Sequence, residues 1–133
     1  MYLAMLSGEE KELFLGLAYA LASSDGNYSD EEKAMMNGYC QEMQITFVKE
    51  EMVKPTEYLL KRFNEISNHK TKKIIVFEAI GLAMADGSYD DSERELIARI
   101  EENFQLETGF AEKCESILSE YILFQAKINQ LII

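Results

Sequence analysis

Apolar residues recur every three or four positions along most of this chain, which is the spacing of amphipathic helices. The first run begins behind Ser7, which can cap a helix, with Glu10 placed to complete a capping box. It stops at the turn signal Asp25-Gly26, and a second run begins with the pair Ser29 and Glu32. No stretch alternates apolar and polar residues long enough for a strand. The sequence therefore predicts an all-α fold.

Two stretches, "LASSDGNYSDEE" at 21–32 and "LAMADGSYDDSE" at 82–93, are nearly the same phrase. Asp25 and Asp86 are 86 − 25 = 61 residues apart, and apolar positions match at this offset on both sides. We expect one domain, 1–133, of six or seven helices. Its repeat halves span roughly 7–48 and 67–108, are related by a pseudo-two-fold axis, and are followed by a helix over 110–131. Ser67 is the expected cap of the helix that opens the second half.

The predicted last helix carries a stripe at alternating spacings of three and four residues: Cys114, Ile117, Tyr121, Phe124, Ile128 and Leu131. A stripe of this kind packs either across a bundle or against a second copy. We expect packing across the bundle, with a seam between two copies as the alternative.

The phrase "ADGSYDDSE" resembles a calcium loop, but an EF-hand requires Gly at its sixth position and Glu at its twelfth. In the two copies these positions hold Asp30 and Met36, and Asp91 and Ile97. Neither copy is therefore an EF-hand. Helix capping explains most residues of the two motifs instead. Gly26 and Gly87 can each end one helix, and Ser29 and Asp90 can each cap the next.

The two aspartates are not explained by capping, because a carboxylate at a helix C-terminus opposes the helix dipole. One interpretation is structural: Asp favours turns and can accept N–H groups from the following helix. The other is that four carboxylates converge across the pseudo-two-fold axis and bind a hard divalent cation through oxygen: Asp25, Glu32, Asp86 and Glu93. The residues alone leave both interpretations open.

The motifs "ALASSDGNYSDEEK" and "GLAMADGSYDDSER", each a helix end followed by Asp-Gly and a Glu seven residues after the Asp, resemble the TerB-like tellurite-resistance family. A similar pattern occurs in the N-terminal region of J-domain co-chaperones. The resemblance implies a compact helical bundle with internal pseudo-symmetry, working in a cytoplasmic stress-response system. It also implies a cation cofactor, Ca²⁺ or Mg²⁺, at the acidic cluster that matches Asp25, Glu32, Asp86 and Glu93.

Charge limits the partners of this chain. The 24 acidic and 13 basic residues give a net charge of −11, which argues against nucleic acid. Residues 49–73 are the exception, because seven bases and four acids make that segment +3. We expect an unknown protein partner, which could be recruited through the acidic surface without any metal, and a monomer or homodimer.

Catalytic and targeting signals are weak. The sole histidine, His69, has no neighbouring Cys, and no nucleophile arrangement or phosphate loop accompanies it, so we expect no enzyme. Cys40 and Cys114 match no zinc or redox spacing and sit among apolar residues, which favours buried thiols in a reducing, cytoplasmic compartment. We expect neither a signal peptide nor a membrane span.

Overall fold

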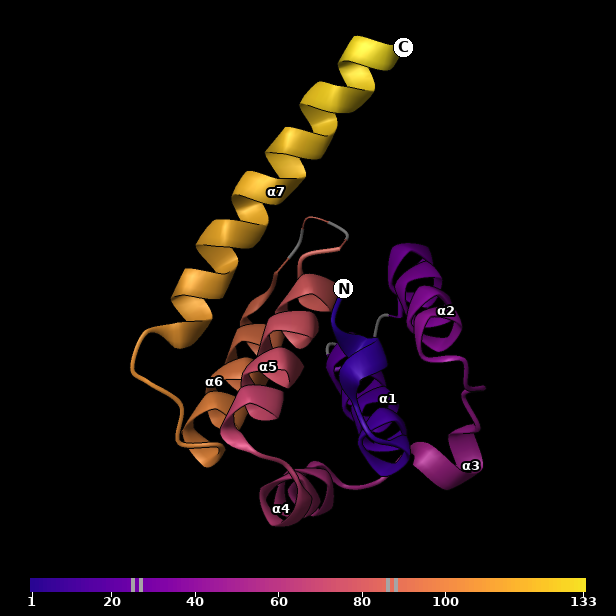
Figure 1. The fold of residues 1–133 in the computed structure, drawn as a ribbon, viewed down its shortest axis with the longest axis vertical. Helices are drawn as coiled ribbons and strands as arrows, with labels where there is room; N and C mark the ends of the chain where they lie inside the picture. The colour runs from indigo at the N-terminus through magenta and orange to yellow at the C-terminus, as the bar shows by residue number, and fades with distance from the viewer. Residues whose placement is uncertain (25, 27, 86, 88) are drawn as a thin grey trace.

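The computed structural model describes residues 1–24, 26, 28–85, 87 and 89–133, and in this part of the chain every regular element is helical (Figure 1). The predicted all-α fold is therefore confirmed. A short 3₁₀ turn, η1 (Leu3–Met5), precedes seven helices: α1 (Gly8–Ala22), α2 (Asp30–Met43), α3 (Lys49–Met52), α4 (Thr56–Ile66), α5 (His69–Ala83), α6 (Asp91–Asn103) and α7 (Phe110–Ile132).

Helices α1 and α5 pack against each other at the centre of the bundle (Figure 1). Because neighbours cover them on several sides, both are apolar around much of their circumference rather than on one stripe. Phe14, Leu17, Ile75 and Ile80 are completely buried there. Burial of each such side chain contributes roughly 1.5–3 kcal/mol of transfer free energy.

The predicted capping boxes are confirmed. Ser7, Ser29 and Asp90 each accept the backbone N–H three residues on, and the glutamates at those positions accept the N-cap N–H in return. The expected cap of α5 is wrong by one residue. Asn68, not Ser67, caps this helix, because its side-chain oxygen accepts the Thr71 N–H at 2.8 Å while Ser67 ends α4.

Helix bounds follow the 61-residue spacing of the two sequence motifs. Adding 61 to the bounds of α1, residues 8 and 22, gives 69 and 83, the bounds of α5, and α2 and α6 begin at 30 and 91. Gln44 and Gln105, also 61 apart, both adopt left-handed backbone conformations, with φ of 57° and 55°. The pseudo-two-fold relation between the halves stays a prediction.

Helix α7 is longer than the bundle that it packs on. Its 23 residues span about 35 Å at 1.5 Å per residue, whereas the 15 residues of α5 span about 22 Å. The first half of α7 packs against α5 and α6, burying Ala111, Cys114 and Leu118. The second half extends beyond the bundle (Figure 1). The expectation that the whole stripe packs across the bundle is therefore wrong: Cys114 is buried, but the five stripe residues from Ile117 to Leu131 are exposed.

Candidate functional site

The carboxylates predicted to hold a cation are only partly placed by the structure. Asp25 and Asp86 lie outside the described residues. Glu32 and Glu93 occupy the third positions of α2 and α6, each with 3% of its surface exposed. Their carboxylates accept the N-cap N–H groups of Ser29 at 3.0 Å and Asp90 at 3.2 Å. Both glutamates thus complete capping boxes, as the structural interpretation predicts.

The two motif corners lie against each other, although 61 residues separate them. Ser24, the last described residue before the first motif's Asp, has its Oγ 3.3 Å from the Oγ of Ser92, which immediately precedes Glu93. The end of α1 therefore meets the start of α6. Among the described residues, no three His, Cys, Asp or Glu side chains gather as a metal site would require.

Tyr28 and Tyr89 pack at these corners, as expected. Each lies beneath a cation from its own half: Lys33 Nζ is 5.6 Å from the Tyr28 ring centroid, and the Arg94 guanidinium is 4.1 Å from that of Tyr89. Burial raises the pKa of both phenols, that of Tyr89 to about 12. They act as corner packing rather than as acids or bases near neutral pH.

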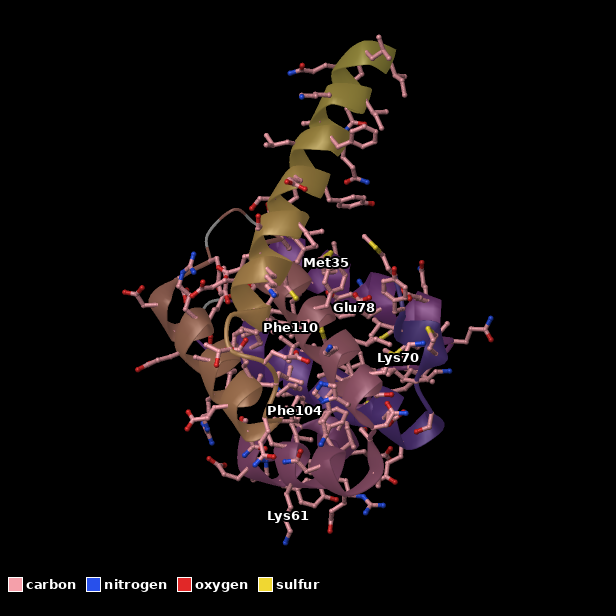
Figure 2. All side chains as sticks on the ribbon, turned by 60° about the vertical axis from the view of Figure 1, so that its left-hand side comes forward. Met35, Lys61, Lys70, Glu78, Phe104 and Phe110 are labelled. Carbon is pink, nitrogen blue, oxygen red and sulfur yellow. The ribbon has the colours of Figure 1, made fainter. Side chains whose placement is uncertain are left out.

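The C-terminal half of α7 is a second candidate site, which the sequence indicated only as the alternative use of the stripe, a seam between two copies. We call residues 119–133 the arm; every one of them is exposed. Figure 2 shows the side chains of this part of the helix standing clear of the bundle. Eight are large and apolar: Tyr121, Ile122, Leu123, Phe124, Ile128, Leu131, Ile132 and Ile133. An exposed apolar surface of this size is typical of protein or membrane interaction sites.

A groove of about 820 Å³ lies at the base of the arm. It is formed by the N-terminal segment, α5 and α7, three segments that are far apart in the sequence. Its apolar lining includes Tyr2, Met5, Ile74, Phe77, Ile117 and Tyr121, and three lysines also line it: Lys70, Lys73 and Lys113. Ile117 and Tyr121 belong to the α7 stripe, so the groove and the arm form one continuous apolar surface.

Partly buried polar contacts hold the N-terminal wall of the groove in place. The backbone N–H groups of Tyr2 and Leu3 donate to the carboxylates of Glu78 and Glu42, both at 2.9 Å. Glu78 is itself buried in α5, and its carbonyl accepts the Tyr39 hydroxyl at 3.2 Å. The Tyr2 ring then packs edge-on against Phe77, with centroids 6.3 Å apart. This wall is therefore built into the core.

The basic start of α5 is tied to the connection that leads into α7. His69 Nε2 lies 3.2 Å and Lys73 Nζ 3.1 Å from the Glu107 carboxylate. These two partners and a backbone N–H hold the pKa of Glu107 at about 2. The lysine also lies over the Phe110 ring, 5.7 Å from its centroid. His69 thus makes a surface hydrogen bond to Glu107.

The two cysteines do not have the surroundings of reactive thiols. Burial raises the pKa of Cys114 to about 11, and it also raises that of the half-buried Cys40. The thiolate is the nucleophile and the metal ligand, so both effects oppose these roles near neutral pH.

No helix in the described part of the chain is both long and apolar enough to cross a membrane. No protein-family model, curated protein or solved structure matches this chain. The resemblance to the TerB-like family therefore rests on the two motifs.

Proposed function

We propose that this chain is a non-enzymatic protein-interaction module whose arm binds a protein partner. The observation that carries this proposal is the exposure of eight large apolar side chains on one projecting helix. At 150–250 Å² for a fully exposed aromatic residue and somewhat less for Ile and Leu, these side chains present roughly 1,000 Å² of surface. A standard protein interface buries about 800 Å² on each partner, so the arm alone is large enough for one.

Charge supports a protein partner over nucleic acid. The chain carries −11 overall, and the arm holds one acid and one base, Glu120 and Lys127. An interface core is depleted of charge in this way, whereas a phosphate-binding surface needs clustered Lys and Arg. The raised pKa values of both thiols support a role other than nucleophilic catalysis.

Site-specific photo-cross-linking in cells tests this proposal. The photoreactive residue p-benzoylphenylalanine replaces Phe124 on the apolar stripe or, as a matched control, Gln130, which lies on the opposite face of the same helix. We expect discrete protein adducts from position 124 and much weaker ones from position 130. No adduct from either position, or equal adducts from both, would contradict a specific interaction through this face.

A second proposal, a divalent cation at the two helix corners, is supported by the 3.3 Å contact between Ser24 and Ser92 and by the burial of Glu32 and Glu93. These two carboxylates stand at neighbouring corners, and carboxylate oxygens suit Ca²⁺ or Mg²⁺ as ligands. These glutamates, together with Asp25 and Asp86, would hold the ion. This proposal retains the TerB-like resemblance and a cytoplasmic stress-response role.

Calorimetric titration of the purified chain with Ca²⁺, Mg²⁺ and Mn²⁺, repeated on an Asp25→Asn/Asp86→Asn variant, tests the cation. The proposal predicts binding heat and a raised melting temperature in the wild type and the loss of both in the variant. Wild-type protein that shows neither at millimolar cation would rule this proposal out. The arm proposal predicts that cross-linking at position 124 is insensitive to chelator.

A further inference from the structure

We infer that the partner of the arm is a second copy of this chain, and that each arm lies antiparallel in the groove of the other copy. This inference rests on the proposed function, since it names the partner for the same surface. Three features carry it: the symmetry of the apolar stripe, the position of the groove on that stripe, and the apolar area that arm and groove bring together.

The stripe on α7 reads the same in both directions. Its six residues, from Cys114 to Leu131, are separated by three, four, three, four and three positions. An identical helix laid antiparallel therefore places Phe124 opposite Tyr121 and Ile128 opposite Ile117. A second copy therefore presents a matching apolar stripe in this register by construction.

The antiparallel register also places the partner's arm in the groove. Ile117 and Tyr121 form the α7 wall of the groove, and they would face the partner's Ile128 and Phe124. The opposite wall is formed by Met5 and by Phe77, whose neighbour Tyr2 is hydrogen-bonded to the buried Glu78. Each arm would thus be covered on two sides. The contact is isologous and closes after two copies, as in most homodimers.

The combined area suits a stable dimer. The four stripe residues of each arm (Tyr121, Phe124, Ile128 and Leu131) present roughly 450 Å², so two arms bring about 900 Å² of surface into the contact before the groove walls are counted. The groove residues Ile117 and Met5, 58% and 60% exposed, raise the total to roughly 1,300 Å², which lies within the range of a standard interface.

Charge on the two surfaces permits this contact. The chain is strongly acidic, yet lysines 70, 73 and 113 line the groove, and Lys73 already pairs with Glu107. The arm of a second copy carries one acid and one base, so it meets these lysines without a net charge of the same sign. A lipid surface fits less well, because helices that lie on membranes carry a Lys- and Arg-rich polar face and the arm has Lys127 alone.

Disulfide trapping tests the register. In an Ile117→Cys/Ile128→Cys variant, the two new cysteines are 11 residues apart, which separates them by about 16 Å along one helix. A disulfide spans a Cα separation of only roughly 4–7 Å. Any cross-link between them therefore joins two copies. We expect mild oxidation to give a covalent dimer in which peptide mapping finds position 117 of one copy bonded to position 128 of the other. Bonds joining 117 to 117 and 128 to 128, or no dimer, would overturn the antiparallel register.

Matched charge substitutions test the groove. Met5→Glu places a carboxylate in the groove, whereas Val53→Glu makes the same kind of change outside it. The native Met5 and Val53 side chains are 60% and 38% exposed, so both variants should fold. In analytical ultracentrifugation we expect Met5→Glu to weaken dimerisation at least tenfold and Val53→Glu to leave it within twofold. Equal effects, or none, would remove the groove from the interface.

The outcomes separate this inference from the proposed function. A purified chain that stays monomeric while position 124 cross-links another protein in cells would leave the arm as a binding site and overturn the second copy as its partner. A monomer that cosediments with phosphatidylglycerol vesicles would overturn the inference in favour of a lipid surface. A dimer in solution with no adduct at position 124 would contradict both statements.

Discussion

Gly16 in α1 is the site where the structure makes its sharpest stability prediction. A Cβ built there would stand 2.3 Å from the carbonyl oxygen of Met52, which ends α3, and 3.4 Å from both methyl groups of Leu59 in α4. The backbone of α3 therefore approaches α1 so closely that no side chain fits between them. Gly16→Ala must move backbone as well as flexible side-chain atoms.

Two opposing contributions set the change in the free energy of unfolding for Gly16→Ala. Replacing a mid-helix Gly by Ala normally stabilises by roughly 0.5–1 kcal/mol. Overpacking a well-packed core costs about 1–3 kcal/mol, and a backbone oxygen cannot rotate away. We expect a net loss of about 1–2 kcal/mol for Gly16→Ala. The matched control is Gly38→Ala in α2, where an added Cβ meets nothing within 4 Å and only the favourable term remains.

Urea unfolding followed by circular dichroism measures both variants. The free energy of unfolding should fall for Gly16→Ala and rise for Gly38→Ala, which corresponds to opposite shifts of several degrees in melting temperature for a chain of this size. The series should be run at several protein concentrations, because a dimer adds a concentration-dependent term to apparent stability. If Gly16→Ala were stabilised as much as Gly38→Ala, the close approach of α3 to α1 would be wrong.

Three further predictions concern caps, pH and thiol reactivity. Ser29→Ala removes a capping-box acceptor at the start of α2 and should cost about 1 kcal/mol in urea unfolding, with little change in Ser119→Ala, an exposed site away from any cap. The Glu107 carboxyl has a folded pKa of about 2, below its ordinary value of 4.5, so its contribution to stability is present above about pH 4.5 and is lost as the pH falls toward 2. The melting temperatures of wild type and Glu107→Gln should therefore converge between about pH 5 and pH 2.5; a constant gap would contradict this. Cys114, with a pKa of about 11, should react with a thiol reagent at about pH 8 far more slowly than the unfolded chain, and equal rates would show that it is accessible.

Local signals made much of the fold predictable. Three helix starts could be predicted because a capping box is encoded within four residues. These starts are the N-caps Ser7, Ser29 and Asp90. Asn68 was missed as a cap because Ser67 beside it has the same chemistry, and only the geometry of the chain leaving α4 decides between them.

The candidate interaction surface was less predictable, because it depends on tertiary placement. The stripe on α7 was read correctly, but its burial depends on the length of the bundle beside it, which sequence periodicity does not contain. One signal was available: Ile122 and Leu123 lie off the stripe, and a helix that packs on one face alone seldom needs them. The groove joins Tyr2, Phe77 and Ile117, and nothing local in the sequence indicates that these residues meet.

Pairing through the arm is tested most directly by sedimentation of the purified wild-type chain from low to high micromolar concentration. We expect a species of 2 × 15.3 = 30.6 kDa that dissociates on dilution. Phe124→Glu should abolish this dimer, whereas Gln130→Glu, which adds the same charge on the opposite face, should preserve it. A mass of 15.3 kDa at every concentration, or equal loss of the dimer in both variants, would contradict pairing through the arm.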